Sequence, residues 1–469
     1  MSASSRLAAA VVGSVLGTSA LSGCAVTLIE GTASPAPGAG GVVAVEEFPI
    51  IGAGDGEIDQ LARNALADLN TYWAEQFPSV FGQDFTPLTG GYYSVDPNDI
   101  DPGQYPNGQI GCGEPPEAVT QNAFYCSPSG EYPNGDAIQY DRDFLAELAS
   151  GYGRFIPALV MAHEFGHAVQ GRVGYPVPAS IVIETQADCF AGAWTAWVAD
   201  GNAPHNSIRP AELDDVLRGY LLLRDPVGTG VGEAEAHGSY FDRVSAFQEG
   251  FDDGPTACRD QFTADRPFTQ RGFSDADLLT GGDAPYGQTV GTFAPQGLSE
   301  FWTSVFDQLG ETFQPPQLEP FDRRAPTCGG QAPDTDLVYC AADGAVGFDE
   351  DELTQPLYEA EEGGDYAVLT AISIPYALAA RDQLGLSTDD QAAVRSAVCL
   401  TGAFTAFVLN GSSQVLSISP GDVDESVSFL LEYSDDPEAF AEADMTGFQL
   451  VDVFRSGVFQ GPAACDVGV

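Results

Sequence analysis

Two neighbouring stretches decide the fold: FIPALVMAHEFGHAVQ at residues 155–170 and IVIETQADCFAGAW at residues 181–194. Apolar residues recur through the first at helical spacing, and Gly166 is its only helix breaker after Pro157, so we expect a buried helix. The second stretch is apolar around its polar residues and predicts another helix, which runs on through Trp197. The residues with the clearest chemical potential lie on these two helices.

The first stretch contains an H-E-x-x-H motif formed by His163, Glu164 and His167. Residues four apart share a helical face, so both imidazoles can reach one metal ion, and Glu164 can approach a water molecule on that ion. With 4 His in 469 residues, chance would produce this motif in only about two of a thousand such chains. The alternative is a pair of hydrogen-bonded histidines on a helix surface.

A catalytic zinc needs a third protein ligand and an open position for water. Glu184 and Asp188 on the second helix are four apart and share a face. An acidic pair is usually a solvated surface, but in these apolar surroundings two buried carboxylates would be costly without partners. We assign Glu184 as the third ligand and Asp188 as the residue that orients a ligand imidazole through its other N–H. The reverse assignment of the two carboxylates remains open.

These motifs resemble those of the bacterial neutral zinc metallopeptidase family. The family pattern is an H-E-x-G-H helix, then E-x-Q-A-D-C-x-A-G-x-W, then a late H-G-S segment followed by R-V-x(2)-F-x(2)-G. Matching segments lie at residues 163–167, 184–194 and 237–250, with upstream Cys-Gly and F-Y-C blocks at Cys112 and residues 124–126. The resemblance covers roughly residues 60–262. One departure is that the family often has His-His where this chain has His followed by Ala.

The resemblance implies a zincin-like (gluzincin-like), helix-rich peptidase domain of the α+β class. It implies that His163, His167 and Glu184 hold Zn²⁺ and that Glu164 is the base for peptide hydrolysis by zinc-activated water. The expected partner is a peptide or protein substrate.

The late segment adds a candidate catalytic residue, His237. In zinc peptidases a late His or Tyr often donates a hydrogen bond to the developing oxyanion, and we expect this role for His237. A helix cap or a core hydrogen bond is the alternative. Arg243 is expected in a structural ion pair, and His205, in a polar loop, has no assigned role.

The chain repeats its own framework. An aromatic-Trp helix, a Phe-x-Pro turn, a Cys-Gly/Tyr-Cys pair and a final GPxAC recur in order, and CFAGAWTAWVADG from Cys189 matches CLTGAFTAFVLNG from Cys399 without a gap. Chance could explain one such block, but five in the same order indicate tandem duplication. We expect two α+β copies, each with a small sheet, including a strand around residues 137–140. We also expect them to pack as an intramolecular pseudo-dimer.

The second copy has lost the candidate chemistry. Ile374, Pro375 and Leu378 stand opposite His163, Glu164 and His167. Val394 and Val398 stand opposite Glu184 and Asp188. We therefore expect a degenerate pseudo-peptidase copy and one Zn²⁺ per chain.

The cysteines fit the same repeat. The chain has 9 Cys, and setting Cys24 aside leaves an even number, as in disulfide-bonded proteins of oxidising compartments. Free core cysteines are the alternative. If each copy repeats one pattern, the pairs are Cys112–Cys126, Cys189–Cys258, Cys328–Cys340 and Cys399–Cys465.

The N-terminus is typical of an export signal. Arg6 precedes an apolar stretch of small residues, and the following Leu-Ser-Gly-Cys resembles a lipobox ending at Cys24. An ordinary cleaved signal is the alternative. Lipid at Cys24 would anchor the chain on the extracytoplasmic face of a bacterial cell membrane. We expect no later span, since the most apolar later segment, residues 366–380, is short and contains Pro375.

The net charge of −51, with no Lys among the 17 cationic residues, argues against binding to nucleic acids or anionic lipid headgroups. The expected parts are a signal peptide (1–24), a flexible tether (25–56), the peptidase domain (57–262), a linker (263–296) and the degenerate copy (297–469). Two rival functions remain, a lipid-anchored scaffold with a structural zinc and a cell-envelope binding module whose second copy recognises the ligand.

Overall fold

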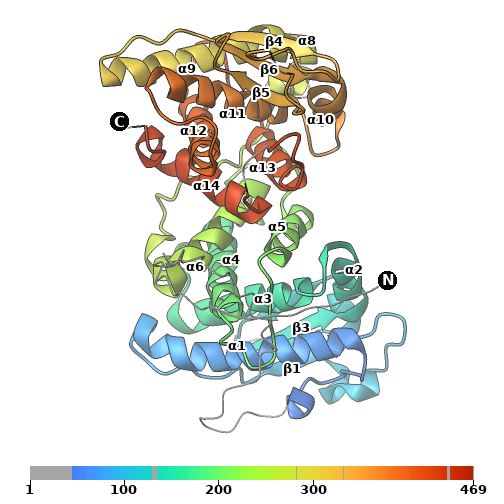
Figure 1. Ribbon diagram of the computed structural model, residues 1–469. Coiled ribbons are helices and arrows are strands. Elements are labelled where there is room, and N and C mark those ends of the chain that lie inside the picture. The colour runs from blue at the N-terminus through green and yellow to red at the C-terminus, as the bar shows by residue number, and fades with distance from the viewer. Residues whose placement is uncertain (1–44, 129–134, 281, 331, 441–443, 468–469) are drawn as a thin grey trace, which may run out of the picture. The chain divides into compact units, whose positions relative to one another are not determined.

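The computed structural model describes residues 45–128, 135–280, 282–330, 332–440 and 444–467. The described chain is helix-rich and has two small mixed sheets, so the expectation of the α+β class is confirmed (Figure 1). The predicted signal peptide, Cys24 and most of the predicted tether lie outside the described residues.

Residues 45–262 are called the first half, residues 263–293 the linker segment and residues 294–467 the second half. The first half contains α1 (Glu57–Phe81), β1 (Gly91–Val95), β2 (Ala123–Cys126), β3 (Ala137–Asp141), α2 (Arg142–Tyr152), α3 (Ile156–Val173), α4 (Ser180–Ala199), α5 (Glu212–Leu223) and α6 (Tyr240–Gln261). The linker segment contains the short helices α7 (Asp277–Thr280) and α8 (Tyr286–Gln288) and a π-helical turn, Thr289–Phe293. The second half contains α9 (Ala294–Leu309), β4 (Gln317–Phe321), β5 (Leu337–Cys340), β6 (Ala345–Asp349), α10 (Gln355–Glu359), α11 (Asp365–Gln383), α12 (Gln391–Leu409), α13 (Asp422–Glu432) and α14 (Gly447–Gln460).

The two sheets have the same topology. The first has the order β1-β3-β2, with β1 parallel and β2 antiparallel to the central β3. The second has the order β4-β6-β5, again with one parallel and one antiparallel partner. A buried Asp ends each central strand, Asp141 before α2 and Asp349 before Glu350–Thr354. Its side chain accepts hydrogen bonds from the backbone of the next helical turn. Each cap ends its strand and starts the following helical segment.

Glycines let two helices approach closely in each half. A Cβ atom at Gly192 on α4 would overlap Phe247 O on α6, and one at Gly250 on α6 would overlap Cys189 O on α4. In the second half Gly402 on α12 and Gly457 on α14 have the same relation to the facing backbone. These contacts explain why small residues recur in both copies of the Cys-x-x-Gly-Ala block.

The four disulfides have the pairing that the repeated spacing predicts: Cys112–Cys126, Cys189–Cys258, Cys328–Cys340 and Cys399–Cys465. The second and fourth join each central helix, α4 or α12, to the end of its half. Such links stabilise mainly by restricting the unfolded chain, by about 2–4 kcal/mol each.

The halves meet through α5 and α6 on one side and α13 and α14 on the other. Asp214 on α5 accepts hydrogen bonds from the backbone N–H groups of residues 447–448, at 3.0 and 2.7 Å, and so caps α14. Asp424 on α13 accepts from the N–H groups of residues 240–241, at 3.1 and 2.9 Å, and so caps α6. Each half therefore caps a helix of the other.

Parts of the predicted tether and of the predicted linker make long-range contacts. Residues 45–56, assigned to the tether, contain a 3-10 turn and Ile51, which pairs with Tyr93 beside β1. In the linker, Thr269 N and Gln270 N donate to the Asp242 carboxylate at 2.8 and 2.9 Å. Long-range contacts thus order parts of both segments, although both are rich in Gly and Pro.

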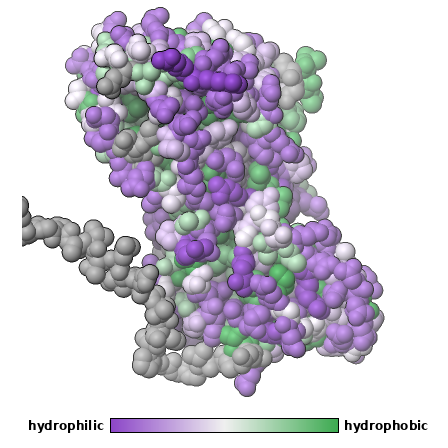
Figure 2. Space-filling view, turned by 45° about the vertical axis from the view of Figure 1, so that its right-hand side comes forward, coloured by the Kyte–Doolittle hydropathy of each residue, from purple (hydrophilic) through white to green (hydrophobic). Residues whose placement is uncertain are grey.

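One helix of the described residues, α12, is long and apolar enough to cross a membrane, and 78% of its most apolar window is buried inside the fold. It is not the segment at 366–380 that the sequence analysis ranked most apolar. Hydrophilic residues cover most of the molecular face seen in Figure 2, as the large negative charge leads one to expect.

Candidate metal centre

Close packing of α3 against α4 brings the motif residues together. A Cβ atom at Gly166 on α3 would lie 2.9 Å from Ala187 Cα on α4, so only glycine fits there without a shift. Phe155, before α3, stacks on Trp194 of α4 with ring centroids 5.7 Å apart. These contacts hold α3 and α4 so close that side chains from the two helices can meet.

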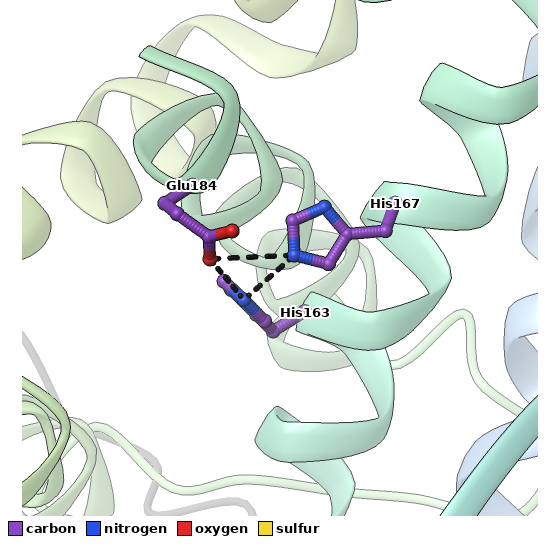
Figure 3. A group of neighbouring side chains, drawn as sticks. All are labelled: His163, His167 and Glu184. Carbon is purple, nitrogen blue, oxygen red and sulfur yellow. Dashed lines mark hydrogen bonds and ion pairs between the residues drawn. The ribbon is translucent and has the colours of Figure 1, made fainter. Parts of the chain in front are cut away.

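Three side chains converge at this contact (Figure 3). His163 Nε2 lies 3.2 Å from His167 Nε2, and Glu184 Oε2 lies 3.2 Å from the first nitrogen and 3.4 Å from the second. Tetrahedral Zn²⁺ with bonds of about 2.0–2.1 Å to nitrogen or oxygen has ligand atoms about 3.3–3.4 Å apart. The donor triangle therefore fits zinc in both spacing and ligand type.

The other ring nitrogens are also held. His163 Nδ1 lies 2.8 Å from Asp188 Oδ1, and His167 Nδ1 lies 2.9 Å from Gln170 Oε1. These contacts direct both Nε2 atoms toward Glu184. Glu184 is thus the carboxylate that reaches both Nε2 atoms, and Asp188 occupies the orienting position. The sequence analysis did not single out Gln170, although it stands one helical turn after His167.

Asp188 is fully buried and is neutralised by Arg243. The guanidinium donates from Nε to Oδ2 and from Nη2 to Oδ1, both at 2.8 Å, and Nη1 donates to Leu223 O. Burial alone would raise the pKa of Asp188, but Arg243 and His163 bring it below its ordinary value. Arg243 thus lies in the ion pair that the sequence analysis expected.

The side chains of the triangle shift one another's pKa values. Burial would lower the pKa of His163, but Asp188 and Glu184 raise it to about 10. Burial likewise would lower the pKa of His167, which Glu184 raises above its ordinary value. The pKa of Glu184 lies well below its usual range because the two histidines outweigh burial. A bound cation would replace these protons as the counter-charge.

Glu164 faces the same pocket and is held by the sheet. It is 7% exposed, and its Oε2 accepts a hydrogen bond of 2.6 Å from Tyr125 N on β2. Burial raises the pKa of Glu164, and the nearby histidines moderate the rise. A carboxylate with raised proton affinity beside a metal centre is suited to accept and return a proton.

The triangle opens into a pocket of about 640 Å³. The side chains of His163, His167 and Glu184 are 13%, 14% and 18% exposed, so the centre is accessible. Apolar residues line part of the wall: Phe124, Phe144, Val160, Ile183, Leu222 and Leu223. An open, partly apolar cavity lined by a few convergent polar side chains is typical of a ligand pocket.

His237 lines this pocket too. Its Nδ1 lies 3.1 Å from Asp225 Oδ1, and its backbone N donates to Asp225 Oδ2 at 2.7 Å. Asp225, which the sequence analysis did not single out, therefore orients His237 and leaves Nε2 free of this contact. His205, by contrast, donates its backbone N–H to Asp68 on α1 and does not line the pocket.

Residues 47–262 match the model of a protein family described as "Putative neutral zinc metallopeptidase". The uncharacterized protein Rv2575 of Mycobacterium tuberculosis is 26% identical over 184 residues, 34% of this chain and 61% of that protein. The uncharacterized protein YpfJ of Escherichia coli K12 is 27% identical over 175 residues, 32% of this chain and 57% of that protein. The chain thus spans about three fifths of the length of these curated relatives.

No solved structure matches the chain significantly. The family match ends at residue 262, where the first half ends, and it contains every residue of the donor triangle. The family implies Zn²⁺, in agreement with the donor spacing. Over residues 47–262, which hold the donor triangle, the chain is therefore similar to the neutral zinc metallopeptidase family.

Proposed function

We propose that the first half is a zinc-dependent peptidase with a zincin-like (gluzincin-like) fold, which hydrolyses peptide bonds without a covalent intermediate. The observation that carries this proposal is the accessible triangle of His163, His167 and Glu184 with the Glu164 carboxylate in the same pocket. The match to the zinc metallopeptidase family supports the reaction class.

A Zn²⁺ ion held by this triangle would supply a Lewis acid that polarises the scissile carbonyl and acidifies water. Glu164 would accept a proton from the attacking water and deliver it to the leaving amine. Asp188 and Gln170 hold the two imidazoles in orientation through their Nδ1 atoms. His237, oriented by Asp225, would donate a hydrogen bond to the oxyanion of the tetrahedral intermediate.

The decisive test is Glu164→Gln. The variant should keep its zinc and lose at least about 100-fold in kcat on a peptide library, because the proton acceptor is removed while the ligands remain. Glu147→Gln on α2, an exposed glutamate, is the matched control and should retain activity. Full activity in Glu164→Gln would remove the assignment.

His237→Ala tests the oxyanion role separately. We expect kcat to fall by about 10–100-fold with zinc content and KM little changed. His205→Ala is the matched control, since that imidazole lies outside the pocket. An unchanged kcat in His237→Ala would reduce His237 to a structural residue.

The second candidate function is a non-catalytic scaffold with a structural zinc. Structural zinc sites are closed by four protein ligands, whereas this group has three within the described residues and opens into a pocket. The geometry favours catalysis. Hydrolysis that stops on chelation and returns with zinc would support the peptidase, and a chelator that only lowers stability would support the scaffold.

The second half is proposed to be a degenerate tandem copy that packs on the first as a pseudo-dimer. The reciprocal caps support this: aligning Cys189 with Cys399 sets Asp214 opposite Asp424, and each caps the other half. Aromatic contacts repeat in the same sense, with centroid distances of 6.5 Å for Phe247–Phe448 and 6.1 Å for Phe241–Phe454. A contact made twice with partners exchanged is the mark of an isologous interface.

One Zn²⁺ per chain follows from this proposal. The positions opposite the triangle, Ile374, Leu378 and Val394, carry no ligating atom. Metal analysis that found two zinc ions per chain would contradict the degenerate copy.

Membrane attachment is proposed from the sequence alone, because Cys24 lies outside the described residues. The mature chain would begin at a lipidated Cys24 on the extracytoplasmic face of the cell membrane. Cys24→Ser should release the protein from membranes and abolish the mass increase of the diacylglyceryl group. A membrane-bound Cys24→Ser variant would contradict the anchor.

A further inference from the structure

A second group of potential metal ligands lies away from the donor triangle. Carboxylate oxygens of Asp283, Asp365, Asp422 and Glu425 all lie within 4.8 Å of one another. Asp283 belongs to the linker segment, Asp365 begins α11, and Asp422 and Glu425 lie in the first turn of α13. We call these four residues the carboxylate cluster.

Three members of the cluster are withdrawn from solvent. Asp365, Asp422 and Glu425 are 7%, 2% and 8% exposed. Among the described residues no ion pair within 4.0 Å joins any of the four to an arginine or histidine. Four acidic groups thus share one site without a neighbouring cation, an arrangement that is costly if all are ionised.

Backbone hydrogen bonds satisfy only part of this oxygen surface. Glu425 Oε2 accepts from Tyr366 N and Ala367 N at 2.9 and 3.1 Å, and Asp365 Oδ2 accepts from Ala284 N at 3.0 Å. Asp422 accepts from Ser419 N at 2.8 Å. Asp365 Oδ1 is buried and has no hydrogen-bond partner in the described part of the chain.

That free oxygen is an observation separate from the clustering. A buried carboxylate oxygen without a donor loses its hydration and gains no hydrogen bond in return, which is unfavourable. Because the carboxylate of Asp365 belongs to the cluster, a ligand that satisfied its Oδ1 would lie among the other three acidic groups. A cation is the ligand that fits such surroundings.

The pKa values of the three buried members of the cluster are raised, as expected for carboxylates that lack a neighbouring positive charge. Burial and then neighbouring carboxylates raise the pKa of Glu425 and Asp422 well above the ordinary values. Burial, offset in part by Ala284 N, raises the pKa of Asp365 to about 6.

We propose that the carboxylate cluster binds one hard divalent cation, with Ca²⁺ as the preferred ion. All four side chains offer oxygen, and Ca²⁺ takes six to eight oxygens at about 2.3–2.6 Å. Ligands on opposite sides of such an ion are about 4.6–5.2 Å apart, which matches the spread of the cluster. Mg²⁺ requires a tighter octahedron, and Zn²⁺ prefers the nitrogen-containing triangle of the first half.

The local backbone is built to admit the cluster. Gly364, with φ of +152°, precedes α11, and a Cβ atom there would lie 2.5 Å from Glu425 Oε1. Any larger residue would displace that carboxylate. The cation would join the linker segment to the N-terminal ends of α11 and α13, so its role is to brace the second half rather than to react.

The test uses the full chain loaded with one equivalent of zinc. Calorimetric titration with CaCl₂ should give one site per chain, and Ca²⁺ at about 100 times Kd should raise Tm by at least about 3 °C. The Glu425→Gln and Asp422→Asn variants should lose both signals. Asp389→Asn, which removes an exposed carboxylate of the second half, should keep both.

A measurement on the unaltered chain guards against variants that fail to fold. Tb³⁺ should bind in place of Ca²⁺ and emit on excitation of nearby tyrosines, and Ca²⁺ should abolish the emission at lower concentrations than Mg²⁺. Absence of calcium binding at millimolar concentrations would overturn the proposal. So would equal calcium responses in the chain and in a folded Glu425→Gln variant.

Discussion

In the first half, α4 and α6 bury the Asp188 carboxylate against the Arg243 guanidinium, whereas α12 and α14 of the second half bury Val398 and Leu450 at the corresponding places. The surrounding framework is the same in both. Each helix pair has its two contact glycines and a disulfide to the end of its half. The ion pair is therefore not what holds such a helix pair together.

The difference between the halves indicates the role of the buried Asp188–Arg243 pair. A buried ion pair can often be replaced by apolar residues of similar size without loss of stability, while removal of one partner is costly. The first half retains the pair where Asp188 also holds His163. The second half, which has no ligand histidine to orient, has an apolar core instead. The buried charges thus serve the candidate metal centre.

The largest expected effect on stability comes from replacing Asp188 and Arg243 by the apolar residues of the second half. Asp188→Val alone leaves Arg243 buried without its carboxylate and should lower the free energy of unfolding by about 3–5 kcal/mol. Adding Arg243→Leu copies the second half and should recover most of that loss, while zinc affinity and hydrolysis stay low because His163 has lost its orienting partner. Urea unfolding and metal titration measure the two quantities.

Additive destabilisation in the double variant would contradict this interpretation, since it would show that the ion pair contributes net stability. The matched control is Val398→Ala/Leu450→Ala in the second half. It should destabilise by cavity formation and leave zinc binding unchanged.

Removing either of the two reciprocal caps should have a smaller effect on stability, but the two variants should differ in activity. Asp424→Ala and Asp214→Ala should each lower the free energy of unfolding by about 1–2 kcal/mol, because each removes a cap across the interface. Asp424 does not line the candidate pocket, but it contacts segments that hold Arg243 in place. It holds the start of α6, which carries Arg243, and its Oδ2 lies 3.4 Å from Arg224 Nη1, next to Leu223, whose carbonyl accepts from Arg243.

We therefore expect Asp424→Ala to lower kcat about 10-fold with little change in KM, and Asp214→Ala to stay within about twofold of the unaltered chain. Asp424→Asn, which keeps an acceptor, should restore most of the activity. Equal losses of kcat in the two alanine variants would show that the interface acts only through global stability.

Much of the centre follows from helical periodicity. The spacing of four along two apolar helices predicts a centre made of His163, His167, Glu184 and Asp188. The structure places these side chains in contact. The disulfide pairing followed from the repeat. Local patterns of this kind are written in the residues themselves, because i and i+4 share a face in any helix.

The remaining features depend on contacts between distant segments. Tyr125 N reaches Glu164 only because β2 packs on α3, and Asp424 reaches α6 only across the interface of the halves. The composition of residues 45–56 predicts a tether. Their ordered structure comes instead from pairing of Ile51 with β1, a contact that composition does not reveal. No local pattern encodes such tertiary contacts.

The smallest expected effect on stability concerns an acidic pair at the interface that breaks the symmetry of the two halves. Arg455 Nη2 of α14 lies 2.7 Å from Asp252 Oδ2 of α6 and 2.7 Å from Asp452 Oδ1. At the exchanged positions stand Phe459, Gln248 and Ser245, so this acidic pair has no counterpart. Burial, followed by repulsion from Asp452, raises the pKa of Asp252 to about 7 despite Arg455.

Because the folded pKa exceeds the unfolded value of about 3.9, the proton on Asp252 stabilises the folded chain below pH 4, and this contribution is lost as pH rises through 7. Asp252→Asn, which mimics the protonated acid, should match the unaltered chain at pH 4 and be more stable at pH 8. The gain should be about 0.5 kcal/mol, since the side chain is 37% exposed and solvent screens the repulsion. Urea midpoints at pH 4, 6 and 8 measure it, with Asp389→Asn, at an exposed carboxylate of the second half, as the control for loss of one charge. A variant less stable than the unaltered chain at pH 8 would mean that the Arg455 ion pair outweighs the repulsion, and that the interface tolerates this asymmetry at no cost.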